Sequence, residues 1–513
     1  MPPSAPIIPP NGHTAGKVQH SRHPETRQPR PSPGPLGALA TLALLVSIAA
    51  AQHPRSAKPH AAPAPGTNQS LQCSIADGFT LAAVGDLIIN QPESNLAAPR
   101  FQAALNLLRH ADAGFGNFEG TALDIRTFKG YPAAENGGQW LIDSPKVPAD
   151  LLRMGIDIVS HANNHATDWG VAGMEETDRR LRAAGVVYAG SGRDLGAARA
   201  PHYLNTPQGR VGIVAMTSTF TPMSRAMNPL GAAPGRPGIN ALRTTASVVL
   251  PKTLFDQARR LRAAILAGMP KAYRDQLPKS KNPKVLSLFR SRFQLGNRVE
   301  LSYKMNQHDL KVILKAIRQG KEDSDFLIAS IHTHEPGNWS DRPPNFLPTL
   351  AHDAINAGAD EFISHGPHQL RGIEIYRGKP IFYSLGNFFF QTALSAPVGA
   401  DLFEAWRMNP ATVTDEEQGA ALNRKWFSGT LWYQSVIAVS RFEHGEVSEI
   451  RLYPVVLGAT RRAADRGIPR LATAAQARPI LERLQRLSAP YHTTIAIEGA
   501  VGVIRPTSGQ PGH

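Results

Sequence analysis

The sequence predicts an α/β protein built on a largely parallel, buried sheet. Across residues 79–217, short apolar runs alternate with amphipathic helical stretches in the order βαβαβαββ. The apolar runs also end in Asp, Asn, Glu or His, and α/β proteins build their sites at the carboxyl ends of parallel strands. With 513 residues, of which 42% are hydrophobic, the chain is long enough for a large core.

The positive charge is concentrated in two segments. The formal net charge is +15, of which residues 1–60 contribute +5 and residues 251–325 contribute +10. Neither segment interleaves aromatic and basic residues, and no recognition motif is present, so nucleic-acid binding is not expected. Cys73 is the single cysteine, which excludes an intramolecular disulfide and a thiolate cage. Any metal site must therefore use His, Asp, Glu and Asn.

The N-terminal segments indicate export. Residues 1–35 are rich in Pro, His and Arg and are expected to be disordered. Residues 36–51 form an uncharged apolar run after basic residues and end in Ala49-Ala50-Ala51, which is typical of a signal peptide or an uncleaved signal anchor. Upstream arginines place the body outside the membrane, and residues 52–74 are expected to be a linker. We therefore expect an exported protein of the cell envelope, either membrane-anchored or periplasmic or extracellular.

The first two predicted strands end in candidate ligands. A strand over residues 79–84 runs into Gly85-Asp86, and a helix is predicted over 95–110. The next strand leads to Asn117 and Glu119, which share one face because side chains alternate along a strand. An amide and two carboxylates are therefore expected at neighbouring strand ends.

The stretch from Gly155 to Gly192 carries a denser polar cluster. A helix over 146–154 precedes a strand that stops at Ser160, and a helical pattern starts at about Gly170. The loop between them holds His161, Asn163, Asn164, His165 and Asp168. Imidazole binds metals and carries protons, and Asn offers an oxygen ligand or hydrogen-bond donors. The alternative is a polar turn with a helix cap.

A basic insertion follows the strands at 186–189 and 211–217. Residues 220–325 open with Pro/Gly-rich turns, continue as a basic helical region and include an amphipathic helix around residues 311–317. Their charge indicates either a solvated helical face or an arm that meets an anionic substrate or a membrane surface.

The sheet pattern then resumes with further histidines. The strand at 325–331 runs into His332, His334 and Glu335, and after a helix at 344–357 the strand at 360–364 runs into His365 and His368. The remaining predictions are a hairpin (372–376 and 381–384) closed by Asn387, a second hairpin (433–442 and 446–456), a helix (471–487), a strand (493–497) and a tail (501–513).

Five predicted strand ends thus carry potential ligands that should converge on one edge of the sheet. Oxygen and imidazole ligands without thiolate suit Mn, Fe, Zn or Mg. Two such ions can activate a water and clamp a phosphoryl or acyl group. The alternative is that the histidines are structural and satisfy buried backbone groups.

The same motifs resemble the bacterial capsule synthesis protein CapA family, associated with poly-γ-glutamate production, over roughly residues 79–460. The motifs are Gly85-Asp86, Asn117-Phe118-Glu119, Ala162-Asn163-Asn164-His165 with Asp168-Trp169-Gly170, His365-Gly366-Pro367-His368, and Tyr383-Ser384-Leu385-Gly386-Asn387-Phe388. The family is similar to calcineurin-like metallophosphoesterases, which implies a four-layered αββα sandwich over residues 75–500, with 220–325 as a helical basic insertion.

The resemblance also implies roles for individual residues. One or two divalent ions would be bound by Asp86, Glu119, Asn164, His332, His365 and His368. His165 would be the general acid or anion stabiliser, with Asp86 and Asn164 beside it in catalysis. Substrate would contact Asn117, Asn163, Asp168, His334, Glu335 and Asn387. The implied partners are an anionic polymer such as poly-γ-glutamate and membrane polymer synthase subunits.

One departure leaves the activity open. Ile88 stands where the superfamily has its first histidine ligand. The chain is thus predicted to be a metal-dependent hydrolase, with two alternatives: a non-catalytic scaffold or polymer-binding partner, and a general metallophosphoesterase.

Overall fold

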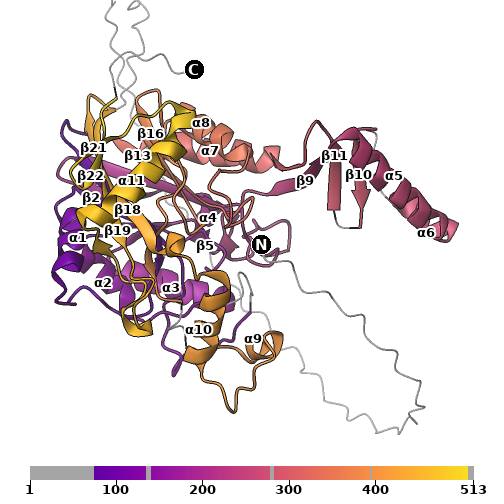
Figure 1. Cartoon of the computed structure of the whole chain (residues 1–513), viewed down its shortest axis with the longest axis horizontal. Helices are drawn as coiled ribbons and strands as arrows, with labels where there is room; N and C mark the ends of the chain where they lie inside the picture. The colour runs from indigo at the N-terminus through magenta and orange to yellow at the C-terminus, as the bar shows by residue number, and fades with distance from the viewer. Residues whose placement is uncertain (1–73, 134–139, 278–281, 290, 393–395, 507–513) are drawn as a thin grey trace, which may run out of the picture. The chain divides into compact units, whose positions relative to one another are not determined.

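Most of the strands belong to two mixed sheets. A computed structural model describes residues 74–133, 140–277, 282–289, 291–392 and 396–506. The predicted disordered N-terminus, signal segment and nearly all of the linker lie outside these residues. Within them, the alternation of strands and helices confirms the α/β class (Figure 1). The strand pattern predicted a largely parallel sheet, whereas both mixed sheets of the structure also contain antiparallel strands.

The large sheet has ten strands in the order β21-β22-β19-β18-β1-β2-β3-β4, with β17 beside β1 and β20 beside β19. Strands β1 to β4 and β17 run parallel, whereas the C-terminal strands are antiparallel. The bounds are β1 (Thr80–Ile88), β2 (Ala113–Phe118), β3 (Ile158–Ser160), β4 (Val187–Ala189), β17 (Asn387–Phe390), β18 (Gln434–Glu443), β19 (Glu446–Val456), β20 (Arg470–Leu471), β21 (Ala496–Glu498) and β22 (Val501–Ile504).

The small sheet has six strands in the order β15-β16-β14-β13-β7-β6. Its central strands β7, β13, β14 and β16 run parallel, and the two edge strands are antiparallel. The bounds are β6 (His202–Thr206), β7 (Gly209–Thr217), β13 (Phe326–His332), β14 (Glu361–His365), β15 (Ile373–Tyr376) and β16 (Lys379–Phe382). The predicted hairpins at 372–384 and 433–456 are confirmed as β15–β16 and β18–β19.

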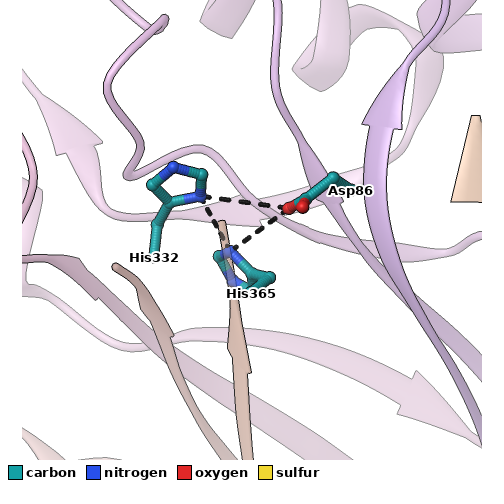
Figure 2. A group of neighbouring side chains, drawn as sticks. All are labelled: Asp86, His332 and His365. Carbon is teal, nitrogen blue, oxygen red and sulfur yellow. Dashed lines mark hydrogen bonds and ion pairs between the residues drawn. The ribbon is translucent and has the colours of Figure 1, made fainter. Parts of the chain in front are cut away.

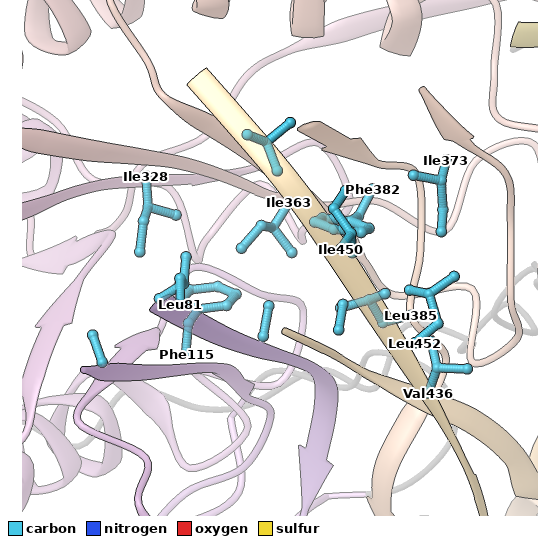
Figure 3. Packing of buried hydrophobic residues seen from close by; sticks show 14 of the residues in the cluster. Leu81, Phe115, Ile328, Ile363, Ile373, Phe382, Leu385, Val436, Ile450 and Leu452 are labelled. Atoms are coloured by element: carbon cyan, nitrogen blue, oxygen red, sulfur yellow. The ribbon is translucent and has the colours of Figure 1, made fainter. Parts of the chain in front are cut away.

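The two sheets pack face to face over a shared apolar core (Figure 3). Alternate residues of the large sheet, such as Leu81, Phe115 and Leu452, meet Ile328, Ile363 and Phe382 of the small sheet. This pattern follows from the period-two alternation of side chains along each strand.

Helices cover the outer faces of both sheets. α1 (Pro99–Arg109), α2 (Val147–Met154) and α3 (Gly170–Ala184) pack on the large sheet. α7 (Gln307–Glu322) and α8 (Phe346–Asn356) pack on the small sheet. α11 (Ala474–Ser488) starts at a capping box formed by Thr473 and Gln476 and buries Ile480, Leu481 and Leu484 in the shared core. The order of layers is therefore helices, sheet, sheet, helices.

The insertion is not helical throughout, which corrects the sequence prediction. After β5 (Ser191–Gly192), α4 (Leu195–Arg199) and β8 (Gly238–Ile239), it forms a four-stranded sheet in the order β10-β11-β9-β12, with two helices. We call this part the basic arm: β9 (Thr244–Leu250), α5 (Lys252–Ala267), α6 (Lys271–Gln276), β10 (Val285–Leu288), β11 (Ser291–Leu295) and β12 (Glu300–Met305). The β-branched run Thr-Thr-Ala-Ser-Val-Val-Leu of β9 favours a strand.

The C-terminal boundary also differs from the prediction. Val501–Ile504, expected to belong to the tail, forms β22 and pairs with Ile450, Arg451 and Leu452 of β19. The remaining helices are α9 (Ala400–Ala405) and α10 (Asp415–Trp426). Among the described residues, every helix is too short or too polar to cross a bilayer.

Candidate metal centre

A close backbone approach places Asp86 at the end of β1. A Cβ on Gly85 would lie 1.8 Å from the carbonyl oxygen of Gly386, so a glycine is required at position 85. The Asp86 amide donates to that same carbonyl at 3.0 Å. β1 thereby passes against the turn before β17, and Asp86 lies between Asn117 of β2 and Asn387 of β17 in the strand register.

The first ligand group consists of Asp86, His332 and His365 (Figure 2). His332 and His365 end neighbouring parallel strands and face each other in register. Asp86 Oδ1 lies 4.0 Å from His332 Nδ1 and 3.8 Å from His365 Nδ1, and the two imidazole nitrogens are 3.1 Å apart. All three side chains are fully buried. Asp86 comes from the large sheet and both histidines from the small sheet, so the group bridges the two sheets.

The second ligand group consists of Glu119, His334 and His368. It adjoins the first group closely: His332 Nε2 lies 3.7 Å from Glu119 Oε1, and His368 Nδ1 lies 3.4 Å from Asp86 Oδ2. His334, predicted from the sequence to contact substrate, lies 3.0 Å from His332 through their Nε2 atoms. Its position makes it a candidate metal ligand.

The chemistry of these groups fits a divalent cation. Both carboxylate oxygens of Glu119 are buried and have no hydrogen-bond partner among the described residues. Burial and the nearby charge of Asp86 raise the pKa of Glu119 well above its usual value. A bound cation would satisfy both oxygens and favour the ionised form. Mixed carboxylate and imidazole ligands suit Mn, Fe or Zn.

Three of the histidines are held in the neutral form that binds metals. Burial lowers the pKa of His332 well below its usual value, and His334 and His365 reinforce the shift. Burial also lowers the pKa of His334 to about 3 and that of His365 to about 4. At neutral pH these rings need lose no proton before binding a cation.

Asp86 is held as a carboxylate. Burial alone would raise its pKa, but the hydrogen bond and charge of His368, with His365 and Asn117, lower the pKa below the usual value. Asn117 Nδ2 donates to Asp86 Oδ1 at 2.9 Å. Asp86 is therefore negatively charged and oriented before any ion binds.

The predicted asparagines lie around the two groups. Asn164 Oδ1 lies 3.2 Å from His334 Nε2, close to the second group. Asn163 Nδ2 donates to the Phe118 carbonyl at 2.7 Å, and Asn387 Oδ1 contacts His368 Nδ1 at 2.9 Å. These contacts orient the loops and ligands, and direct contact with substrate remains a prediction.

His165 and Asp168 form a buried pair beside the second group. His165 Nδ1 lies 2.6 Å from Asp168 Oδ2, and His165 Nε2 lies 3.9 Å from Glu119 Oε1. Asp168 also accepts from the Leu141 amide at 2.8 Å. Burial lowers the pKa of His165 to about 3, so the ring is neutral. With Nδ1 donating to Asp168, Nε2 is left as the acceptor of the ring. The predicted role of His165 as general acid or anion stabiliser stays a prediction.

The sequence reasoning missed Asp143. This residue is buried, and burial together with the charge of Asp168 raises its pKa well above the usual value. Asp143 forms an isolated β-bridge with Ala122. The sequence around Asp143 carries no motif. Its relevance follows only from its proximity to the Asp168 charge.

Two other polar residues have structural partners. Glu335 Oε2 accepts from the hydroxyls of Ser218, Thr219 and Thr333 at 2.6–2.9 Å. Nδ1 of His161 contacts Asp178 Oδ1 at 2.8 Å. Neither belongs to a ligand group, and the substrate contact predicted for Glu335 is untested.

Comparison with known proteins assigns the chain to a family. The model of the bacterial capsule synthesis protein PGA_cap matches residues 80–392. The chain is 45% identical over 446 residues to the uncharacterized protein y4sH of Sinorhizobium fredii, which covers 85% of this chain and 95% of that protein. It is 24% identical to the capsule biosynthesis protein CapA of Bacillus anthracis, over 61% of this chain and 60% of that protein.

The chain also aligns with the solved structure of the NAD nucleotidase NadN of Haemophilus influenzae. The alignment covers 80% of this chain and 56% of NadN, with 10% identity and a TM-score of 0.28. This likeness is too weak to support an argument. The family match spans both ligand groups and all of the predicted site residues. The chain therefore belongs to the bacterial capsule synthesis protein PGA_cap family.

Proposed function

We propose that this protein acts at the cell envelope in the synthesis, release or trimming of a capsule polymer such as poly-γ-glutamate, through a metal-dependent hydrolase-type site. The observation that carries the proposal is the pair of adjoining, buried ligand groups around Glu119 and His332. The capsule biosynthesis relative supports the polymer. The layer order of helices, sheet, sheet and helices supports a metallophosphatase-like fold.

Each ligand group would hold one divalent ion. Asp86, His332 and His365 would bind the first; Glu119, His334 and His368 would bind the second, with the Asn164 amide oxygen nearby. Bound ions would supply Lewis acidity toward a carbonyl or phosphoryl oxygen of the substrate.

The protein's own residues would manage protons and orientation. Asp168 fixes the ring of His165, which leaves Nε2 to take a proton at the edge of the second group. Asn163 fixes the loop that carries His165, since its Oδ1 accepts from the His165 amide at 3.0 Å. In this arrangement His165 is the proton carrier, and Asp168 and Asn163 are positioning residues.

Membrane polymer synthase subunits are proposed as partners, because the apolar segment 36–51 would hold the protein beside the membrane. Cross-linking in cells that express the full chain, followed by identification of the captured proteins, tests this part. Deletion of residues 36–51 should abolish the cross-links if the segment provides the anchor.

Metal content and polymer length test the central proposal. The three main core clusters lie entirely between Ile75 and Ile504, so residues 72–513 can be purified as one segment. Elemental analysis should find about two equivalents of divalent metal, one fewer after Asp86→Ala and one fewer after Glu119→Ala. His444→Gln is the matched control, because its side chain is 88% exposed.

The second assay tests activity and uses poly-γ-glutamate whose length is measured by gel filtration. The metal-loaded protein should shorten the polymer, and His165→Ala should slow this while retaining metal. Absence of metal in a folded wild-type protein would contradict the proposal. Metal binding without shortening, but with retention of the polymer, would favour a scaffold role; release of phosphate from simple esters would favour a general phosphoesterase.

A further inference from the structure

We propose that the basic arm docks on the anionic surface of a lipid bilayer. This inference goes beyond the metal centre and does not depend on it. It rests on the distribution of exposed apolar side chains, the spacing of those on α5, and the charge around them.

Exposed apolar side chains are concentrated on the basic arm. Fifteen large hydrophobic residues are exposed among the described residues, and eight of them lie between residues 252 and 301. The exposed fractions reach 82% for Phe289, 66% for Tyr273 and 54% for Leu261. The eight are Leu254, Leu261, Met269, Tyr273, Leu277, Phe289, Val299 and Leu301. Scattered single residues of this kind need no explanation, but a cluster indicates an interaction surface.

Helix α5 presents a continuous apolar stripe. Leu254, Ala258, Leu261 and Ile265 are spaced by four, three and four residues, which places them on one side of the helix. The single buried residue of α5, Phe255, packs with Leu250 and Leu286, which also belong to the arm. Ala258 of the stripe packs partly against this core, whereas Leu254 and Leu261 are 41% and 54% exposed.

The same segment is strongly basic. Residues 252–276 contain six Lys or Arg and two Asp, a net charge of +4. Arg259, Arg260 and Arg262 all lie within two residues of Leu261. A helix with a basic polar face and an exposed apolar stripe is typical of segments that lie in the plane of a bilayer, with the apolar side in the headgroup boundary.

A bilayer fits these features better than a soluble polyanion. A polyanion would pair with the basic side chains but would leave the leucines, Met269, Tyr273 and Phe289 in water. An anionic bilayer accommodates both, because its headgroups attract the cations and its acyl boundary accepts the apolar side chains. At 16 residues, α5 is also shorter than a membrane-spanning helix, in keeping with a helix that lies on the surface.

Vesicle sedimentation tests the proposal. Residues 72–513 are used, because this compact unit lacks the apolar segment 36–51, which would bind lipid by itself. We expect at least tenfold stronger partitioning to vesicles of equal phosphatidylglycerol and phosphatidylcholine than to phosphatidylcholine alone. The preference should fall as salt concentration rises.

Two variants separate the apolar and the charged contributions. Leu254→Ser/Leu261→Ser/Tyr273→Ser should weaken partitioning at least tenfold, and Arg259→Gln/Arg260→Gln should remove most of the preference for anionic lipid. A matched control removes three exposed apolar residues outside the arm, Tyr131→Ser/Met223→Ser/Leu230→Ser, and should bind as the wild type does. Circular dichroism of each variant verifies that the fold is retained.

The proposal is overturned if the stripe variant (Leu254→Ser/Leu261→Ser/Tyr273→Ser) and the wild type partition equally to anionic vesicles. It is also overturned if the wild type ignores both vesicle types but is retained by immobilised poly-γ-glutamate, since the arm would then bind polymer. Concentration-dependent self-association that the stripe variant abolishes, without vesicle binding, would instead assign the surface to a second copy of the chain.

Discussion

Acidification should destabilise the metal-free protein, and His365 should account for a measurable part of the loss. This side chain is fully buried, with Nε2 2.8 Å from Ser330 Oγ, and its pKa is about 4 instead of 6.5. Between these two values the unfolded chain binds a proton that the folded protein excludes. The free energy of unfolding therefore falls as the pH decreases through this window.

The size of the effect follows from the two pKa values. One pKa unit corresponds to about 1.4 kcal/mol, so the span from 6.5 to about 4 corresponds to roughly 3 kcal/mol for His365 alone. His165 and His334, whose pKa values are lowered to about 3, add to the acid sensitivity. His365→Asn should lower stability at neutral pH but also reduce its loss between about pH 7 and pH 4.5 by ~2–3 kcal/mol.

The assay is urea unfolding of residues 72–513 in chelator, followed by tryptophan fluorescence at several pH values. His444→Gln is the control, because its side chain is 88% exposed and belongs to neither ligand group. The reasoning would be refuted if His365→Asn and the wild type lost equal stability on acidification.

Three further substitutions test the close approach at Gly85 and two buried charged or titratable groups. Gly85→Ala would bring a Cβ to 1.8 Å from the Gly386 carbonyl, so it should lower the melting temperature and the metal content together; unchanged values would contradict the close approach. Asp309→Ala would leave Arg199, only 6% exposed, without its 3.2 Å ion pair, and should cost about 3–5 kcal/mol of unfolding free energy in urea. Glu361→Gln removes a buried carboxyl whose pKa burial raises well above the usual value, so the folded protein keeps a proton that the unfolded chain loses above about pH 4.5. In urea unfolding, the free energy of unfolding of the variant minus that of the wild type should be larger at about pH 8 than at about pH 5. An equal difference at both pH values would argue against a buried neutral acid.

Strand periodicity was sufficient to predict that the side chains of the first ligand group lie close together. Asp86, His332 and His365 each lie at the end of an apolar run. Parallel pairing places such ends at one edge of the large sheet and at one edge of the small sheet. The division into two sheets could not be obtained from periodicity, because fully buried strands of either sheet show the same apolar pattern. It was expected only from the family resemblance.

The assignments that changed lie beyond the strands. His334 follows the last residue of β13 by two positions, where the chain has left the sheet and alternation no longer predicts direction. Asp143 has no local signal, since its pKa is raised by burial in the folded chain and by the charge of Asp168, 25 residues later. In the insertion, the basic helical pattern does not extend to β9, whose β-branched residues favour a strand.

The origin of the ligands in both sheets has a consequence for folding and motion. Asp86 and His365 are separated by 279 positions in the chain, and an ion held by both would act as a non-covalent staple across the sandwich. Metal affinity would then measure how well the two sheets are docked, and stripping the metal should increase amide hydrogen exchange along β1 and β14 before it affects the outer helices. A substitution deep in the inter-sheet core, far from any ligand, could thus lower metal occupancy by allowing the sheets to shift.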